Sequence, residues 1–210
     1  MVKKRDFLIL LGVILLFFSV CSNQNPSRAD SVSKATGVYS VSEIPDIEQI
    51  NMETDAIIFL YSYHHGNTRK IANAIAPVIN ASIIDIENNI FGLLERYKLI
   101  GFGSGIDSER HFQPLLDFAE RLPNVQDKKA FIFSTSGIYS EDKMLKDHEA
   151  LRNILQSKGF IIIGEFGCLG HNTNSFLRIF GGMNKGRPNP EDVRNAGFFA
   201  ENLKSEKEFL

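Results

Sequence analysis

Short apolar runs alternate with segments of helical periodicity over most of the chain. The apolar runs are rich in Ile and Phe and have the length of β-strands; they cover residues 56–61, 82–86, 98–103, 129–134 and 160–165. Helical spacing, with apolar residues three and four positions apart, occurs within residues 71–78, 115–122, 151–155 and 193–203. The last helix has a favourable start, because Asn189 can cap it and Pro190 fits its first turn. The pattern therefore predicts buried strands with helices between and after them.

The order of these elements indicates the fold class. A strand, a helix and a second strand in succession form a right-handed crossover, which produces a parallel sheet with helices on both faces. We therefore expect an α/β fold: a three-layer, doubly wound, five-stranded parallel sheet. Ligands of such sheets bind at the carboxyl ends of the strands. The connection at residues 167–188 has a length that is often functional, whereas residues 87–97 leave room only for a short helix.

Composition is typical of soluble globular proteins, with 43% hydrophobic and 23% charged residues. The chain has 23 Lys and Arg against 25 Asp and Glu, a net charge of -2, so no strong field recruits nucleic acid. Two cysteines, Cys21 and Cys168, are too few for a disulfide scaffold or a cysteine-rich metal site. Cys168 fits best as a small buried residue. We predict no nucleic-acid partner and no metal.

The amino-terminal residues differ in composition from the rest. A basic stretch, residues 3–5, precedes an uncharged apolar run, residues 7–20, which is the layout of an export signal. The run is short for a membrane-spanning helix, which needs about 20 residues. We divide the chain into a signal peptide, lipoprotein signal or membrane anchor at 1–22, a polar lead-in at 23–53 and a folded domain at 54–210.

Three fates of this leader are open. Cys21 could carry a lipid, although only Ser19 among the three preceding residues matches the usual lipoprotein pattern. A peptidase could cleave after Ala29, because Ser27-Arg28-Ala29 is similar to an A-x-A site. The segment could also remain as an uncleaved anchor. In each case the basic end stays inside, so we predict a membrane-associated or exported protein, or a cytoplasmic one if the true start lies further along the chain.

The turn after the first predicted strand carries the most informative chemistry. Ser62 to Thr68 lead from the strand into a helix, where Gly66 permits a tight turn and Asn67 stands at the helix start. Amide groups at the amino end of a helix, with hydroxyl and amide side chains beside them, bind phosphate without a lysine. The turn has neither the Gly-Lys-Ser/Thr end of a P-loop nor the GxGxxG pattern. Taken alone, it predicts either an anion site or a simple helix cap.

Four stretches of the domain resemble the flavodoxin family. The tract IIFLYSYHHGNTRKIANA, residues 57–74, resembles its FMN phosphate loop, and LIGFGSGIDSERHFQPLLDFAERL, residues 99–122, resembles its third strand, flavin-contacting loop and following helix. The FSTSG turn at 133–137 and the stretch at 181–192 are also similar, so the resemblance extends over residues 55–203. It implies a flavodoxin-like fold with strand order 2-1-3-4-5 and FMN as the cofactor.

The resemblance assigns the FMN phosphate to the first turn, chiefly to Gly66, Asn67 and Thr68. The other candidates in this turn are Ser62, Tyr63, His64 and His65. Family members usually have Ser or Thr at positions 63 and 65, so either His65 binds the phosphate or the turn is reshaped. As an imidazolium, His65 could pair with the phosphate dianion, because the reference pKa of histidine is about 6.5.

Two further loops are implied to contact the flavin ring. The loop beside the isoalloxazine comprises Gly103, Ser104, Gly105, Ile106 and Asp107. The loop at the pyrimidine edge comprises Thr135, Ser136 and Gly137, with Tyr139 as an aromatic face. Ser136 lacks a G-x-S-x-G elbow, so we predict no catalytic residue. His111 and Phe112 are expected to open the following helix.

The function that the resemblance implies is electron transfer through FMN. Electrons would pass to a redox partner protein, or from NAD(P)H to a small acceptor such as a quinone in an FMN-dependent oxidoreductase. The near-neutral charge argues against a strongly acidic shuttle. The alternative is a binding or structural module of the same fold that has lost FMN, which the departures at Tyr63, His65 and Asp107 motivate.

Overall fold

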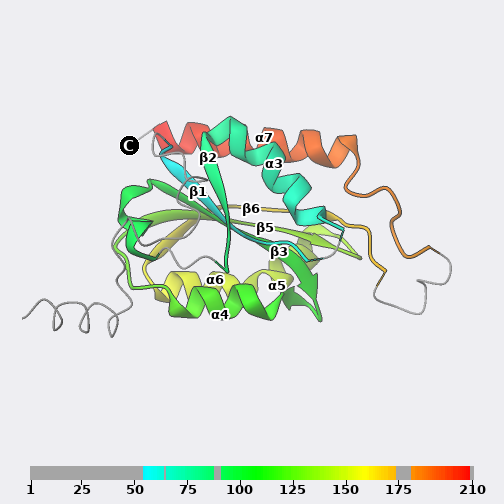
Figure 1. Ribbon diagram of the computed structural model, residues 1–210, viewed down its shortest axis with the longest axis horizontal. Helices are drawn as coiled ribbons and strands as arrows, with labels where there is room; N and C mark the ends of the chain where they lie inside the picture. The colour runs from blue at the N-terminus through cyan, green and yellow to red at the C-terminus, as the bar shows by residue number, and fades with distance from the viewer. Residues whose placement is uncertain (1–53, 64, 88–90, 174–180, 209–210) are drawn as a thin grey trace, which may run out of the picture. The chain divides into compact units, whose positions relative to one another are not determined.

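Five parallel strands form the central sheet in the computed structural model, which describes residues 54–63, 65–87, 91–173 and 181–208 (Figure 1). They lie in the order β2-β1-β3-β5-β6, and the short strand β4 pairs antiparallel with the end of β3. The bounds are β1 Ala56–Tyr61, β2 Ala81–Asp85, β3 Leu99–Asp107, β4 Arg110–His111, β5 Lys128–Ser136 and β6 Phe160–Leu169. Counted along the chain without β4, the order is 2-1-3-4-5, so the expected α/β fold and strand order are confirmed.

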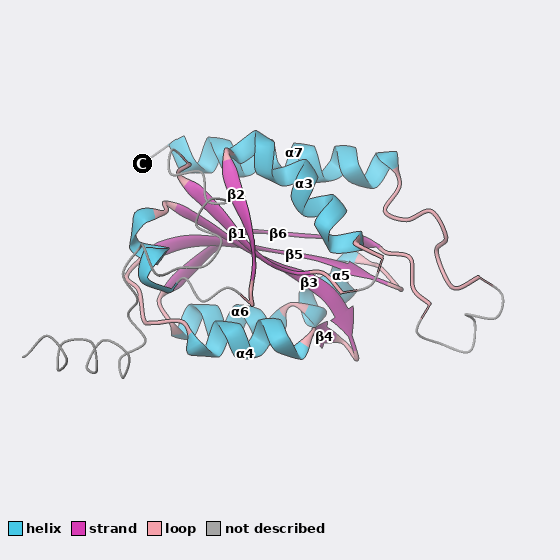
Figure 2. Ribbon diagram, in the orientation of Figure 1, coloured by secondary structure: helices cyan, strands magenta, loops and turns pink. Residues whose placement is uncertain are grey.

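Helices cover both faces of this sheet (Figure 2). Two of them, α3 (Asn67–Ile79) and α7 (Pro190–Glu208), lie side by side on one face. The other face carries α4 (Gln113–Arg121), α5 (Glu141–Asp147) and α6 (Glu149–Ser157). A short 3₁₀ helix, η3 (Phe91–Arg96), connects β2 to β3. The three expected layers are therefore present.

The side chains of β1 show how the sheet holds two cores. Ile57 and Phe59 pack in the core that α4 and α6 cover, whereas Ile58 and Leu60 pack beneath α3 and α7. Successive side chains of a strand point to opposite faces, so a strand that is covered on both faces is apolar at every position. This explains the uninterrupted apolar run from which the strand is predicted.

Several elements differ in extent from the expectation. The strands β3, β5 and β6 extend past their apolar runs to Asp107, Ser136 and Leu169, because polar and glycine residues continue the hydrogen-bonded ladder. The short helix α5 precedes α6 in a region where the periodicity predicts one helix. The start of α7 has the expected cap, since Asn189 Oδ1 accepts from the N–H of Asp192 at 2.9 Å and Asp192 Oδ2 accepts from the N–H of Asn189 at 2.7 Å.

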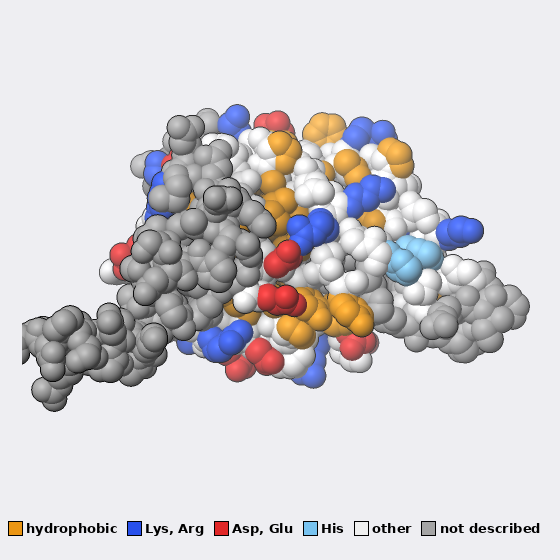
Figure 3. Space-filling model, viewed as in Figure 1, with side chains coloured by type: hydrophobic (Ala, Val, Ile, Leu, Met, Phe, Trp, Pro, Cys, Tyr) orange, Lys and Arg blue, Asp and Glu red, His pale blue; other side chains and the backbone are white. Residues whose placement is uncertain are grey.

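No helix within the described residues is long and apolar enough to cross a membrane. The leader predicted at 1–22 and the lead-in predicted at 23–53 lie outside the described residues. On the face seen in Figure 3, basic and acidic side chains are interspersed over the described part of the molecule. This distribution agrees with the small net charge of the sequence.

Candidate functional site

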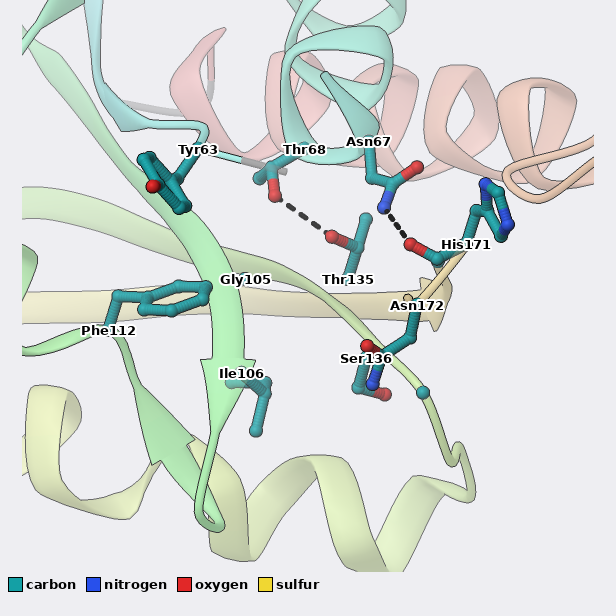
Figure 4. Close-up of a pocket in the computed structure, with 12 residues that line it drawn as sticks. Tyr63, Asn67, Thr68, Gly105, Ile106, Phe112, Thr135, Ser136, His171 and Asn172 are labelled. Atoms are coloured by element: carbon teal, nitrogen blue, oxygen red, sulfur yellow. Dashed lines mark hydrogen bonds between the residues drawn. The ribbon is translucent and has the colours of Figure 1, made fainter. Parts of the chain in front are cut away.

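A groove opens at the carboxyl ends of the parallel strands, between the amino end of α3 and the β3–β4 hairpin (Figure 4). It holds about 420 Å³ of space between protein atoms, including the part that is open to solvent. The lining residues are Tyr63, Asn67, Thr68, Gly105, Ile106, Phe112, Thr135, Ser136, Gly137, Gly170, His171 and Asn172. Segments distant in sequence thus converge where open α/β sheets bind ligands.

One part of the groove is polar and contains the start of α3 (Figure 4). Gly66 is the N-cap residue of this helix, with a φ of 64°, and has no side chain with which to cap it. Within the described residues, the N–H groups of Asn67 and Thr68 have no hydrogen-bond acceptor. The hydroxyls of Thr68 and Thr135 are hydrogen-bonded to each other at 2.9 Å. Unpaired amides at the amino end of a helix stabilise an anion.

The other part of the groove is apolar and is lined by Tyr63, Ile106 and Phe112. The rings of Tyr63 and Phe112 lie on the same side of the groove in Figure 4, and the ring of Tyr61 contacts both, with centroids 6.5 Å and 5.7 Å away. The N–H of Phe112 donates to the Gly105 carbonyl at 3.2 Å. A Cβ atom on Gly105 would come 2.6 Å from Phe112 Cε2, so the close approach of this ring requires glycine.

The segment after β6 closes the groove. The N–H of Gly170 donates to the Ser136 carbonyl at 2.8 Å, and the side-chain amide of Asn67 donates to the His171 carbonyl at 2.8 Å. Asn172 also lines the groove. The length of the connection at residues 167–188 indicates in the sequence that it is functional. Length alone does not indicate which of its residues face the groove.

Comparison with known proteins decides the family. A family model described as a flavodoxin domain matches residues 58–202, well over half of the chain. This chain belongs to the flavodoxin domain family. The match runs from β1 into α7 and therefore includes every segment that lines the groove.

Relatives of this flavodoxin domain are found at high and at low identity. An uncharacterized protein of Methanocaldococcus jannaschii is 43% identical over 148 residues, which cover 70% of this chain and 97% of the relative. Flavodoxin 1 from Bacillus cereus is 21% identical, with a TM-score of 0.53 over 74% of this chain and 99% of its own. A flavodoxin from the domain Archaea is 14% identical, with a TM-score of 0.51 over 73% of this chain and 97% of its own. The solved structures show that the fold is shared.

All three loops that the sequence assigned to FMN contribute to the groove. The expected residues that line it are Tyr63, Asn67, Thr68, Gly105, Ile106, Thr135, Ser136 and Gly137. The expected residues that lie elsewhere are Ser62, His65, Gly66, Gly103, Ser104, Asp107 and Tyr139. His64 lies outside the described residues. The structure adds Phe112, Gly170, His171 and Asn172 to the lining.

His65 braces the first turn against the connection after β6. Its Nε2 is 2.9 Å from Thr173 Oγ1, and its ring stacks on that of His171 with centroids 4.6 Å apart. His65 and Gly66 both have positive φ, of 52° and 64°. Ser62 Oγ accepts a hydrogen bond at 3.2 Å from the N–H of Arg69 in the first turn of α3. These residues therefore shape the turn from outside the groove.

The second expected loop is part of a strand. Residues 103–107 continue β3, and residues 108–109 form the turn of the hairpin with β4. Of the two residues expected to open the following helix, Phe112 does so as the N-cap residue of α4, whereas His111 lies in β4 and pairs with Ile106. A two-residue strand has no periodicity to read, so only the polar turn residues indicate this hairpin in the sequence.

The residues at the end of β3 differ in their roles. Gly105 lines it, whereas Ser104 is fully buried and packs toward the opposite face of the sheet. Gly103 lies beneath the ring of Phe133, so it serves core packing. Asp107 is exposed at the end of the strand. Ser104 and Gly105 therefore have different roles because their positions face opposite sides of the sheet, while Ile106, nearer the end of the strand, also lines the groove.

Cys168 of β6 and Tyr139, which lies close to Gly167 of that strand, are outside the groove. Tyr139 Cε2 is 3.1 Å from the position that a Cβ on Gly167 would occupy, and burial raises the pKa of the Tyr139 hydroxyl. Cys168 is 5% exposed, which confirms its expected place as a small buried residue. Burial, together with the charge of Asp192, raises the pKa of its thiol to about 12. Among the described residues there is no cluster of side chains that could hold a metal ion.

Proposed function

We propose that this flavodoxin domain binds FMN in the groove and transfers electrons through it. The observation that carries the proposal is the division of the groove into a polar part at the start of α3 and an apolar part at Tyr63 and Phe112 (Figure 4). FMN is divided in the same way, with a phosphate and a ribityl chain at one end and a flat aromatic ring at the other. Membership of the flavodoxin domain family supports this choice of ligand.

The residues of the groove fit this cofactor. The N–H groups of Asn67 and Thr68 lie at the positive end of α3, where a phosphate dianion is stabilised. The rings of Tyr63 and Phe112 offer apolar faces, and stacking between aromatic rings contributes about 0.5–1.5 kcal/mol beyond the burial of area. The phosphate would thus be held by backbone amides and the ring by side chains.

FMN supplies the redox chemistry when it is bound, while the protein orients the ring and shields it from water. Within the described residues no carboxylate, lysine or arginine lines the groove, and His171 is its single histidine. No residue is therefore assigned as a general acid or base. Electrons leave either to a redox partner protein or, in an oxidoreductase that NAD(P)H reduces, to a small acceptor.

Binding of two flavins to the full chain tests the proposal. Titration followed by flavin fluorescence should show FMN bound at micromolar concentration or below, and riboflavin bound more weakly because it lacks the phosphate. The near-isosteric Asn67→Asp variant adds a negative charge at the polar end and should weaken FMN by about tenfold. This variant also loses the hydrogen bond from Asn67 to the His171 carbonyl. Riboflavin controls for that loss because it lacks the phosphate, so its binding should be weakened much less than the binding of FMN. No binding of FMN to the wild-type chain would overturn the proposal in favour of a module that has lost its cofactor.

A second measurement separates the two versions of electron transfer. Anaerobic mixing of the FMN-loaded chain with NADH or NADPH reports direct reduction by the loss of flavin absorbance. In an oxidoreductase that uses NAD(P)H, the nicotinamide should reduce the bound flavin at least as fast as the enzyme turns over. In a carrier between proteins, the nicotinamide should reduce the flavin only slowly.

We further propose that residues 1–22 export the protein or attach it to a membrane. The basic stretch at 3–5 followed by the apolar run at 7–20 supports this proposal. Mass spectrometry of the mature amino terminus tests it, because a lipidated Cys21, a terminus after Ala29 and an intact leader differ in mass. An intact chain in the soluble fraction of its native cell would contradict both export and attachment.

A further inference from the structure

Two buried histidines lie behind the groove, on the face of the sheet that α5 and α6 cover. His111 of β4 and His148, between α5 and α6, are 1% and 0% exposed, and their ring centroids are 4.8 Å apart. The groove does not include either of them. Burial of an ionisable group costs folding free energy unless its partners compensate, so the pair calls for a physical account.

The hydrogen bonds of Ser104 determine the tautomer of His111. Ser104 Oγ donates to the Gly105 carbonyl at 2.8 Å, so its contact of 2.8 Å with His111 Nδ1 is one in which it accepts. His111 therefore carries its proton on Nδ1, and its Nε2 is a bare lone pair. This nitrogen is buried and has no hydrogen-bond partner among the described residues. Such an unpaired polar atom is uncommon in a folded protein.

His148 differs because both of its ring nitrogens have partners. Its Nδ1 is 2.8 Å from Glu165 Oε2, and its Nε2 is 2.8 Å from Ser134 Oγ. Arg152 donates to both carboxylate oxygens of Glu165, at 2.6 Å and 2.8 Å. Burial acts to raise the pKa of Glu165, but the hydrogen bonds from His148 and Arg152 lower it to about 2. The carboxylate stays ionised and fixes the ring of His148.

The surroundings keep His111 neutral. Burial lowers its pKa well below 6.5, and the electrostatic interaction with His148 lowers it further. The other charged groups on the elements packed around it include Asp107, Arg110, Lys143, Asp147, Arg152 and Glu165. Asp107 and Arg110 are exposed, and the remaining four are held in ion pairs with one another. These charged groups therefore leave His111 neutral. A new negative charge near His111 would favour its protonated form.

The β3–β4 hairpin connects His111 to residues that line the groove. His111 pairs across the hairpin with Ile106, and Phe112 follows it in sequence, and both of these residues line the groove. Its partner Ser104 directly precedes Gly105, which also lines the groove. Electrostatic interactions in a water-poor interior are stronger than in water. A charge that appears in the groove thus shifts the protonation of His111.

We propose that His111 is the internal proton acceptor of this protein, and that its Nε2 takes up a proton from solvent when electrons enter the flavin in the adjoining groove. The inference rests on the proposed binding of FMN. Two electrons from a low-potential donor and one proton from solvent leave one negative charge on the bound flavin. A second solvent proton forms the N–H bond at His111 Nε2 and converts the imidazole to an imidazolium, so the net charge of protein and cofactor is unchanged.

Proton nuclear magnetic resonance of the histidine ring hydrogens tests this in the full wild-type chain. The midpoint of the His111 titration is measured in the FMN-free chain, in the FMN-loaded chain and in the loaded chain after reduction with dithionite. We expect His111 to stay neutral above its low pKa in the first two states. Its titration midpoint should rise by about one pH unit after reduction, because the opposite charge favours the imidazolium.

Proton uptake gives a second readout. The variant His111→Asn keeps a side-chain donor for Ser104 but removes the titrating nitrogen. In weakly buffered solution, on the acid side of pH 6.5 and halfway between the two measured midpoints, the wild-type chain should take up about half a proton more per flavin than this variant, because midpoints about one pH unit apart leave His111 partly protonated in both states. At pH 8 the two should take up the same number, which serves as the internal control.

The outcomes separate the two proposals. FMN binding with the same His111 midpoint in the oxidised and reduced states, or a His111 that is already protonated in the oxidised state, overturns this inference alone. Failure of the chain to bind FMN overturns the proposed function, and with it the role of His111. The wild-type titration decides the matter even if His111→Asn does not fold.

Discussion

Gly103 of β3 lies directly beneath the ring of Phe133 on the adjacent strand β5. The two residues are partners in the β3–β5 register, and a Cβ atom on Gly103 would come 2.1 Å from Phe133 Cζ. The ring is fully buried, so making room for the added methyl group would disturb the surrounding core. We therefore expect Gly103→Ala to lower the free energy of unfolding by about 1–3 kcal/mol through overpacking, as measured by urea denaturation followed by circular dichroism.

Two variants control for the glycine-to-alanine change itself. Gly197 is half-buried in α7 and has no atom within 4 Å of an added Cβ, so Gly197→Ala should raise stability by about 0.5–1 kcal/mol. Replacing Phe133 by Leu in the Gly103→Ala background should recover part of the loss, because the smaller side chain relieves the overlap. Additive effects of Gly103→Ala and Phe133→Leu would contradict the assigned contact.

Stability in acid should depend on Glu165. Its pKa is about 2 in the folded chain and about 4.5 when unfolded, because hydrogen bonds from His148 and Arg152 outweigh its burial. A carboxyl whose folded pKa is depressed contributes its full stabilisation above pH 4.5 and loses it as the pH falls toward 2. This contribution is about 3 kcal/mol. Denaturation at a series of pH values should show that the stability of Glu165→Gln falls less between pH 4.5 and 2 than that of the wild-type chain. Parallel plots of unfolding free energy against pH for the two proteins would contradict this role of Glu165.

Cys168 should be chemically inert in the folded chain. Its thiol is buried and has a pKa of about 12, so only about one in 10⁴ molecules carries the reactive thiolate at pH 8. In a Cys21→Ser background, a disulfide reagent such as DTNB should label Cys168 slowly under native conditions. Labelling should become fast and stoichiometric in urea. Rapid native labelling would show that β6 opens at its carboxyl end.

Phe112 should determine affinity for the flavin ring. We expect Phe112→Leu to weaken FMN and riboflavin by the same factor, about three- to tenfold, because both ligands share the ring that this side chain faces. Flavin fluorescence titration measures both affinities. The matched control is Phe198→Leu, an aromatic substitution at a 67% exposed position on α7. A loss of affinity for FMN but not for riboflavin would indicate that Phe112 contacts the phosphate end of the ligand and not its ring.

The sequence predicts the elements of this fold well where periodicity is long. The apolar run of β1 and the helical spacing of α3 are apparent in the sequence because each side chain meets a large, regular core. The β3–β4 hairpin is not apparent, since β4 has two residues and its pairing depends on register. The sequence therefore assigns Phe112 only to the start of a helix, whereas the structure shows that this N-cap residue of α4 also lines the apolar part of the groove.

Local chemistry by itself determined the tight turn at Gly66, the helix start at Asn67 and the family resemblance that these residues carry, because turn and cap conformations depend on adjacent residues. Only the tertiary structure decided that Gly105 faces the groove while Ser104 bonds to His111 on the other side of the sheet. The physical reason is the two-residue repeat of a strand, which sends neighbours to opposite faces. What each face then contacts depends on helices and strands that are distant along the chain.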